Sequence, residues 1–451
     1  MSEFKTIARH AGTVLVGQLA VMSFGVADTV IAGRYSPQAL AVLSLASSIY
    51  ISIYVDLNGL LQALLPVWSE LHGAGKTREL GRSFRQALYI TALATLTGMA
   101  GLWFPDPWLS WTQVPLELWP DVRSYLRILA IALVPSLLFR MYSTLNQSLG
   151  LPRLVTWLQA GALLVKIPLS LVFTFGLGPW PGLGVVGCAW ATLVVNSLMM
   201  LTGLWLLRTQ DIYQPYGLWQ RIEVPQWPLL KRYLQLGIPA GLTVMVEVTS
   251  FTMMALFVAR LGAVASAGHQ IAASLASVLY MVPLALGIAS SARTGYWLGA
   301  QQAGKARRAT YLGLGLTVGA ALVCAGALLA GREAIAHAFT TDPVVAQTAT
   351  VWLGWVALYH LADAVQATSV FLLRCYRITM APLLIYTALL WGLGLYGGYR
   401  LAYQGLGSWA ARPSVDTFWM TSTAALALVS VLFTAMVWRA SRLTPQGGQM
   451  H

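Results

Sequence analysis

Long apolar runs, each ended by a short polar segment, follow one another along the whole chain. Most runs are longer than the roughly 20 residues that a helix needs to cross a hydrocarbon core, and far longer than the ~10 residues of a barrel strand. The pattern predicts an all-α polytopic membrane protein with twelve transmembrane helices. The expected spans are residues 12–33, 39–68, 86–109, 123–146, 154–177, 184–208, 233–260, 266–298, 309–330, 346–373, 380–403 and 416–439.

Two similar polar segments indicate an internal repeat. HGAGKTRELGRSFRQAL at 72–88 resembles LGAQQAGKARRATYLGL at 298–314, and each follows the second long span of its half. Six spans per half is an even number, so both halves enter the membrane from the same side. We expect two six-helix lobes related by a pseudo-two-fold axis along the membrane normal. The N-terminal lobe is predicted at 1–208, a cytoplasmic linker at 209–230, and the C-terminal lobe with a short tail at 231–451.

Charge sets the orientation of the helices. Only 10% of the 451 residues are charged and 57% are hydrophobic, whereas soluble domains carry about 25% charged residues. With the N-terminus inside, eighteen of the 28 Lys and Arg residues face the cytoplasm and six face outward. This bias predicts that both termini are cytoplasmic. The net charge of +13 reflects basic residues scattered at helix ends, so the lipid bilayer, and no nucleic acid, is the expected partner.

Motifs of enzymes are missing from the sequence. There is no HExxH, GxSxG, GxxxxGK[ST] or CxxC, and the three cysteines lie far apart. GLGVVG at 182–187 and GLGLYG at 392–397 match a nucleotide-binding pattern by letters, but neither follows a strand of a βαβ unit. We therefore expect no enzymatic activity and no cofactor.

Four acids lie inside predicted spans. They are Asp28, Asp56, Glu247 and Asp363. A carboxylate at the centre of a membrane helix costs roughly 2.5–3.5 kcal/mol on insertion scales, so such residues are usually functional. Counting from the cytoplasmic ends of their helices places Glu247 and Asp363 at similar depth in the C-terminal lobe. Two carboxylates at one depth can share a proton or a small cation.

The two lobes differ in chemistry at these positions. The repeat offset places the first-half equivalents of Glu247 and Asp363 near Ala20 and Ser136, which cannot ionise. Each buried acid can instead be a structural polar contact inside the bundle. Asp56, for example, has Asn58 nearby.

Several sequence blocks, in order along the chain, resemble one transporter family. They are GVADTVIAG, LAVLSLASSIY, GLGVVGCAWAT, GIPAGLTVMVEV, AGHQIA, MVPLALGIASSARTGYWLGA and YHLADAVQ. Together they resemble the multidrug and toxic compound extrusion (MATE) transporters of the bacterial NorM-like branch. The resemblance implies a cation-coupled antiporter, driven by H⁺ or Na⁺, that exports amphipathic and mostly cationic compounds by alternating access. We expect a monomer in the bacterial inner (plasma) membrane.

The resemblance also implies roles for individual residues. Glu247 and Asp363 match acids that bind the coupling cation, which makes them a possible Na⁺ site. Tyr359 matches the tyrosine one turn before the second acid. Asp28 matches an acid linked to proton coupling in the first lobe. A wider substrate or polar network is expected at Lys166, Ser170, Asp56 and His360.

The chain departs from the family at Lys166 and Ser170, where asparagines are expected. A lone ammonium in mid-membrane is costly and needs an acidic partner. In the family, the fifth span lies beside the first, so Asp28 is the expected partner of Lys166. A close pair would hold Asp28 ionised and leave ion coupling chiefly to Glu247 and Asp363.

Two other functions remain open at this point. One is a flippase for a lipid-linked precursor from the same superfamily, which would need a basic cavity for its pyrophosphate. The other is an exporter with narrow specificity for one natural product.

Overall fold

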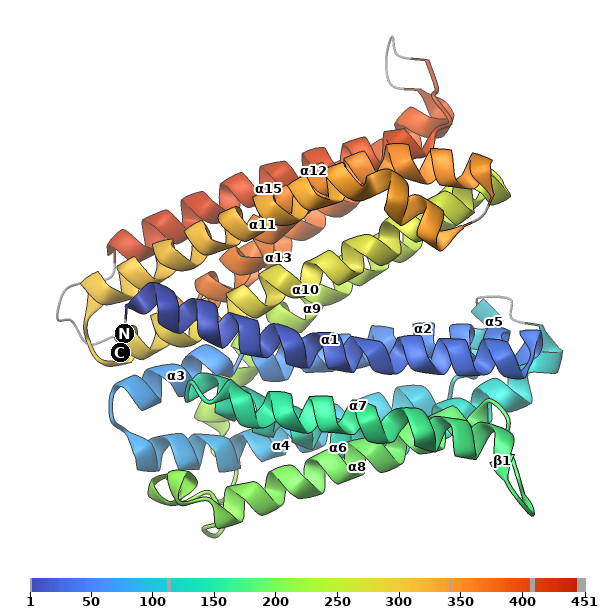
Figure 1. Cartoon of the computed structure of the whole chain (residues 1–451). Coiled ribbons are helices and arrows are strands. Elements are labelled where there is room, and N and C mark those ends of the chain that lie inside the picture. Colours follow the sequence, from blue (N-terminus) through green and yellow to red (C-terminus); the bar gives the residue numbers. More distant parts are fainter. Residues whose placement is uncertain (1, 112–114, 341, 406–409, 444–451) are drawn as a thin grey trace. The chain divides into compact units, whose positions relative to one another are not determined.

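The computed structural model describes residues 2–111, 115–340, 342–405 and 410–443, and it is almost entirely helical (Figure 1). The elements of the first half are α1 (Glu3–Tyr35), α2 (Pro37–Gln62), α3 (Leu65–Gly73), α4 (Thr77–Trp103), α5 (Asp106–Trp111), η1 (Leu116–Leu118), α6 (Trp119–Ser148), α7 (Pro152–Phe175), the short strands β1 (Gly176–Leu177) and β2 (Trp180–Pro181), α8 (Val186–Thr209) and η2 (Asp211–Tyr216). Those of the second half are α9 (Trp227–Ala259), α10 (Ala263–Gly299), α11 (Ala303–Phe339), α12 (Pro343–Cys375), α13 (Met380–Thr387), η3 (Ala388–Tyr396), α14 (Gly397–Tyr399), η4 (Arg400–Gln404) and α15 (Val415–Leu443).

The helices form two compact units. The N-terminal unit is Val16–Gly241, and the C-terminal unit comprises the described residues of Met1–Leu15 and Leu242–His451. Helices α1 and α9 therefore each contribute to both units. The units divide after Leu15 in α1 and after Gly241 in α9, and these two points are 226 residues apart. The two similar polar segments, which begin at residues 72 and 298, are separated by the same number of residues. The predicted lobe boundaries at 208 and 231 stay predictions.

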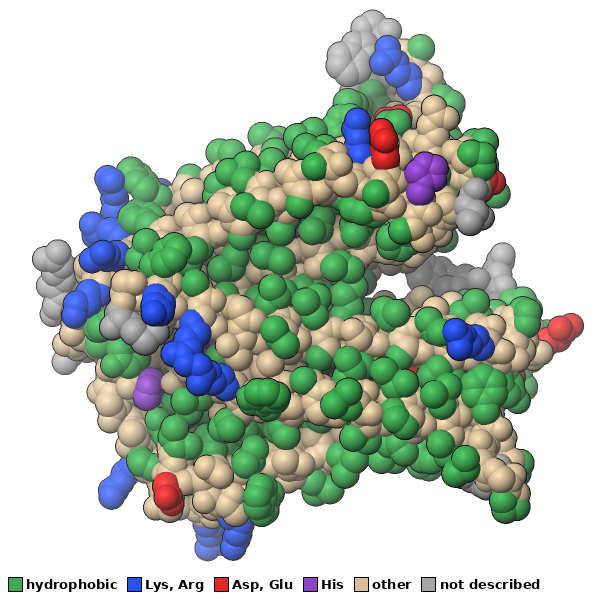
Figure 2. All heavy atoms as spheres, in the orientation of Figure 1, with side chains coloured by type: hydrophobic (Ala, Val, Ile, Leu, Met, Phe, Trp, Pro, Cys, Tyr) green, Lys and Arg blue, Asp and Glu red, His purple; other side chains and the backbone are tan. Residues whose placement is uncertain are grey.

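One buried helix organises each unit. In the N-terminal unit, α6 packs against α2, α4 and α8, and 83% of the residues in its 18-residue apolar stretch are buried. In the C-terminal unit, α12 packs against α10, α11 and α15 (Figure 1), and 78% of the residues in its 18-residue apolar stretch are buried. The outer helices keep apolar side chains on their exposed faces, as Figure 2 shows for the visible side. Such outward apolar surface is expected of helices that contact lipid.

The predicted spans differ in how strongly apolar their helices are. Within the described residues, eleven helical segments are both long enough and apolar enough to cross a membrane. The predicted span at 86–109 corresponds to α4, which is absent from that set. Its apolar part includes Gln86, Thr91 and Thr95, all buried where α4 packs against its neighbours. Polar side chains that face other helices lower the average hydropathy of the segment.

Two predicted spans are also interrupted by proline. The span expected at 39–68 breaks between Gln62 and Leu65, because Pro66 has no N–H to continue the helical hydrogen-bond ladder. The span expected at 86–109 ends at Trp103, because Pro105 disfavours helical backbone at the residue before it. The helix α5 then begins as a separate element.

The span predicted at 380–403 has mostly π-helical backbone. After α13, the backbone widens into η3 and, past the single turn α14, into η4. Thr421 of α15 donates to the backbone oxygen of Gly394 at 2.8 Å, and a side chain at Gly398 would collide with Thr421 and Phe418. The absence of side chains at these glycines lets the π-helical segment approach α15 closely. π-helical turns often occur at functional sites.

A buried arginine of α4 binds the segment after α8 through hydrogen bonds. Arg85 is 3% exposed, and its guanidinium donates to the backbone oxygen of Gly217 and to both carboxylate oxygens of Glu223. Gln86 donates to the backbone oxygens of Glu223 and Val224 at 3.2 and 3.0 Å. The hydrogen bond from Arg85 lowers the pKa of Glu223 to about 2. The stability from this pair is therefore complete above pH ~4.5 and is lost as the pH falls through about 2.

Arg85→Ala should release this linker. Hydrogen bonds to charged groups contribute roughly 1.5–3 kcal/mol, and 1.4 kcal/mol is tenfold in an equilibrium. In purified protein, trypsin should therefore cut after the exposed Arg221 at least about tenfold faster than in the unmodified chain. Arg78→Ala, an exposed residue of the same helix, is the control. Equal cleavage rates in both variants would show that Arg85 does not hold the linker.

Candidate functional site

Two carboxylates lie inside the C-terminal unit. Asp363 of α12 is 3% exposed, and the side-chain amide of Gln366 donates to its Oδ1 at 3.3 Å. The same amide nitrogen donates to the hydroxyl oxygen of Tyr386, on α13, at 3.3 Å. Glu247 of α9 is partly buried and interacts electrostatically with Asp363 and through a side-chain hydrogen bond with Tyr386. Gln366 and Tyr386 thus connect the two acids.

This arrangement suits a small cation. Two ionised carboxylates in a poorly hydrated site repel each other, and water screens that repulsion only weakly. A proton or a monovalent cation bound at Glu247 and Asp363 would remove the repulsion, and the Tyr386 hydroxyl offers a neutral oxygen beside them. The described residues contain no cluster of three or more His, Cys, Asp and Glu that could hold a metal ion. The Na⁺ site expected at the two acids stays a prediction.

Aromatic rings pack beside the acids. Tyr359 lies one helical turn before Asp363 and is 3% exposed. Its ring meets the rings of Phe251 and Trp419 edge-on, with centroid distances of 5.6 and 5.5 Å. His269 lies 5.7 Å from Trp419, and the structure shows no hydrogen-bond partner among the described residues for either of its ring nitrogens. The cluster draws side chains from α9, α10, α12 and α15.

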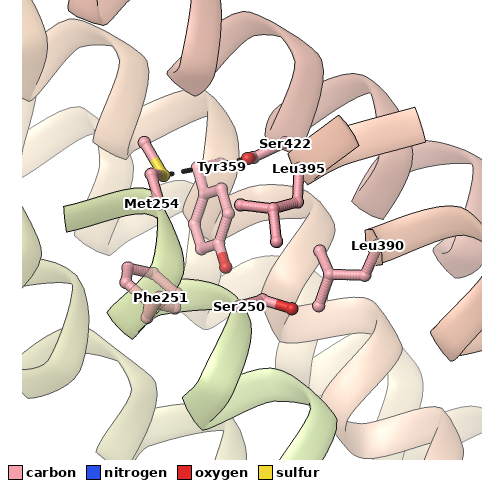
Figure 3. Close-up of a pocket in the computed structure, with 7 residues that line it drawn as sticks. All are labelled: Ser250, Phe251, Met254, Tyr359, Leu390, Leu395 and Ser422. Atoms are coloured by element: carbon pink, nitrogen blue, oxygen red, sulfur yellow. Dashed lines mark hydrogen bonds between the residues drawn. The ribbon is translucent and has the colours of Figure 1, made fainter. Parts of the chain in front are cut away.

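A small cavity adjoins this cluster (Figure 3). Phe251 and Met254 of α9, Tyr359 of α12, and Leu390 and Leu395 of η3 line it. Its water-accessible space is about 10 Å³, enough for about one water molecule. The cavity is therefore far too small for a drug-sized molecule.

The ion pair predicted in the N-terminal unit is confirmed. The Nζ atom of Lys166, on α7, lies 2.8 Å from Oδ1 and 2.9 Å from Oδ2 of Asp28, on α1. The hydroxyl of Ser170 donates to Asp28 Oδ1 at 2.9 Å. Lys166 and Ser170 are 0% exposed and Asp28 is 7% exposed. The charges are thus neutralised within the unit.

The two units use different groups at equivalent helix positions. Ser136 of α6 lies near the position that the repeat offset pairs with Asp363, and it accepts a hydrogen bond from the amide of Asn196, on α8, at 2.7 Å. A neutral hydrogen bond between buried groups leaves no charge to neutralise. The N-terminal unit therefore has a pre-paired acid, and the C-terminal unit has two acids with no basic partner among the described residues.

The wider polar network expected at four residues is only partly present. Lys166 donates to Ser170 at 3.0 Å, but no hydrogen bond between described residues joins Asp56 or His360 to them. His360 lies in the C-terminal unit, and its buried Nε2 has no partner among the described residues. Asp56 lies where α2 approaches Gly241, without a hydrogen bond in the described structure. No hydrogen bond between Asp56 and Asn58 occurs in the described structure either, and the side-chain oxygen of Asn58 has no partner among the described residues.

Several residues of the two sites were not predicted, among them Gln366, Tyr386, Trp419 and Thr192, whose hydroxyl oxygen lies 2.9 Å from Lys166 Nζ. Gln366 follows Asp363 by one turn, so helical spacing offered a signal for it. Tyr386, Trp419 and Thr192 come from other helices, where the sequence contains many similar aromatic and hydroxyl residues. Only tertiary packing identifies these three.

Known proteins resemble this chain over nearly its full length. The MatE family model matches residues 14–172 and 239–399. A probable multidrug resistance protein NorM of Aromatoleum aromaticum is 38% identical over 94% of this chain and 91% of its own. The multidrug resistance protein PmpM of Pseudomonas aeruginosa is 33% identical, over 92% and 86%. A crystal structure of a mutant Vibrio cholerae MATE transporter VcmN superposes with a TM-score of 0.88 at 17% identity, covering 99% of this chain and 98% of that one.

Breaking the Lys166–Asp28 pair should destabilise the fold. Lys166→Met and Asp28→Asn each leave one buried charge alone, which costs roughly 3–5 kcal/mol. Each should lower the thermal unfolding temperature in detergent, and the double variant should recover part of the loss because neither charge remains. Lys231→Met, an exposed lysine of the same unit, is the control. A double variant no more stable than the worse single variant would mean that the two charges do not stabilise each other.

Proposed function

This chain belongs to the MatE family, and on that premise we propose that it is a cation-coupled antiporter that exports amphipathic, mostly cationic compounds. It is a multi-pass membrane protein of a transporter family and not an enzyme. The observation that carries the proposal is the pair of acids Glu247, partly buried, and Asp363, buried, which interact with each other and have no basic partner among the described residues. Its relatives named for multidrug resistance supply the substrate class.

Coupling requires the ion and the substrate to favour different states. A ligand shifts a conformational equilibrium only by the difference between its affinities for the two states. In our proposal, H⁺ or Na⁺ entering from outside binds at Glu247 and Asp363 and stabilises a state that holds the drug poorly. The drug then leaves outward, and release of the ion to the cytoplasm resets the cycle. Tyr359 and Tyr386 position the acids within this site.

The proposal includes the setting of the protein. Both termini face the cytoplasm of a bacterial cell, because positively charged loops are retained inside. The chain works as a monomer in the inner membrane. Aromatic and methionine side chains along the helices suit flat apolar cations, through cation–π and sulfur–aromatic contacts. We favour drug export over the flippase because the C-terminal unit offers carboxylates where a pyrophosphate would need basic groups.

Expression in a host that lacks its own drug pumps should lower the accumulation of cationic dyes. A fluorescent panel that includes cationic, neutral and anionic dyes measures both activity and charge preference. Dissipating the proton gradient, or omitting Na⁺, identifies the ion. Unchanged accumulation across the cationic dyes would contradict multidrug export, and activity toward one compound alone would point to the narrow natural-product exporter.

Neutralising either acid should abolish gradient-driven export. Glu247→Gln and Asp363→Asn keep the side-chain volume but remove the charge that binds the ion. In proteoliposomes, we expect each variant to lose at least about 90% of transport, since removing one charged ligand costs more than the 1.4 kcal/mol of a tenfold effect. Glu333→Gln, an exposed acid on α11, is the control. Near-normal transport by either variant would assign that acid a structural role.

A further inference from the structure

The surroundings of Lys166 resemble those of a bound cation. Besides both oxygens of Asp28, its Nζ lies 3.0 Å from Ser170 Oγ, 2.9 Å from Thr192 Oγ1 and 3.1 Å from the backbone oxygen of Cys188. Five oxygens thus surround an ammonium that has only three hydrogens to donate. A shell of carboxylate, hydroxyl and carbonyl oxygens is the set that hard cations prefer in proteins.

The neighbouring hydroxyls are oriented to accept. Ser170 donates its hydrogen to Asp28 Oδ1 at 2.9 Å, and Thr192 donates its own to the Cys188 backbone oxygen at 3.0 Å. Since each hydroxyl has a single hydrogen, the oxygen lone pairs are left for Lys166. The side-chain oxygens around Lys166 are therefore all free to act as acceptors for its ammonium.

We propose that Lys166 is a resident cation: its ammonium fills a monovalent-cation site in the N-terminal unit and closes that site to free ions. One carboxylate gives the oxygen shell a formal charge of −1, and Lys166 already neutralises it. A second cation would leave an uncompensated positive charge beside Lys166, Ser170 and Asp28, which are 0–7% exposed, and a poorly hydrated site opposes such a charge strongly. Helices α1, α7 and α8 of one unit supply all the oxygens.

One consequence rests on the proposed function: a coupling ion would then have its binding site only in the C-terminal unit. The cation site itself can be tested without transport. Removing the lysine side chain should expose the same five oxygens, now with an unpaired carboxylate, to ions from solution. The site, which the Lys166 ammonium occupies in the unmodified chain, would then bind a free cation.

The test compares thermal unfolding of purified protein in NaCl, LiCl, KCl or choline chloride at equal ionic strength. Lys166→Ala should unfold at least about 2 °C higher in one of the metal chlorides than in choline chloride, since a ligand that binds only the folded state stabilises it. This gain should exceed any shift in the unmodified chain. It should vanish in Lys166→Ala/Asp28→Asn, which lacks the carboxylate. n-Propylammonium chloride, which supplies the atoms that the variant lacks, should also stabilise Lys166→Ala.

Two results would overturn the proposal. One is a Lys166→Ala protein with no ion-specific gain over the unmodified chain. The other is a gain that persists after Asp28→Asn. If Lys166→Ala cannot be purified folded, Lys166→Asn, which is shorter and neutral but polar, enters the same comparison with the same criteria. The two proposals can be contradicted independently. The absence of an ion effect in Lys166→Ala would not change the export results for Glu247 and Asp363. Normal export by Glu247→Gln would likewise leave the ion effect at Lys166 unchanged.

Discussion

A charge buried in a membrane must be neutralised close by, and this constraint explains most of what is unusual in the molecule. Water cannot screen a carboxylate or an ammonium inside a packed helical bundle, so an unpaired ion there costs several kcal/mol. The chain contains few such groups, and they lie on helices that face the interior of their unit. At Asp28, Asp363 and Lys166, neighbouring residues supply hydroxyls, amides or an opposite charge.

The two units meet this constraint in opposite ways. In the N-terminal unit the protein itself supplies the neutralising positive charge, since the side chain of Lys166 on α7 reaches Asp28 on α1. In the C-terminal unit Glu247 and Asp363 have only neutral partners, Tyr386 and Gln366, among the described residues. The first arrangement is complete without any ligand. In our proposal, a proton or cation bound at Glu247 and Asp363 relieves the repulsion in the second arrangement, and a coupled transporter can use that difference.

Much of this architecture could be predicted from the sequence. The long apolar runs located the helices, and the cost of a mid-membrane lysine required an acid near Lys166; the family resemblance then indicated Asp28. The π-helical backbone of η3 could not be predicted, because its glycines and leucines suit an ordinary membrane helix equally well. Thr192 was also missed, since most membrane threonines bond only to their own helix. Asp56 and His360 were expected in a wider polar network, but among the described residues no hydrogen bond joins either of them to Lys166 or Ser170.

The central claim is that ion coupling belongs to the C-terminal unit alone, and the ion-to-substrate ratio tests it most directly. The ratio is measured in proteoliposomes as the membrane voltage at which net substrate movement stops for known gradients. Our account predicts the same ratio for the unmodified chain and for the Asp28→Asn/Lys166→Met double variant, even if the variant transports more slowly. A lower ratio in the double variant would show that the N-terminal unit also carries coupling ions and would contradict the account.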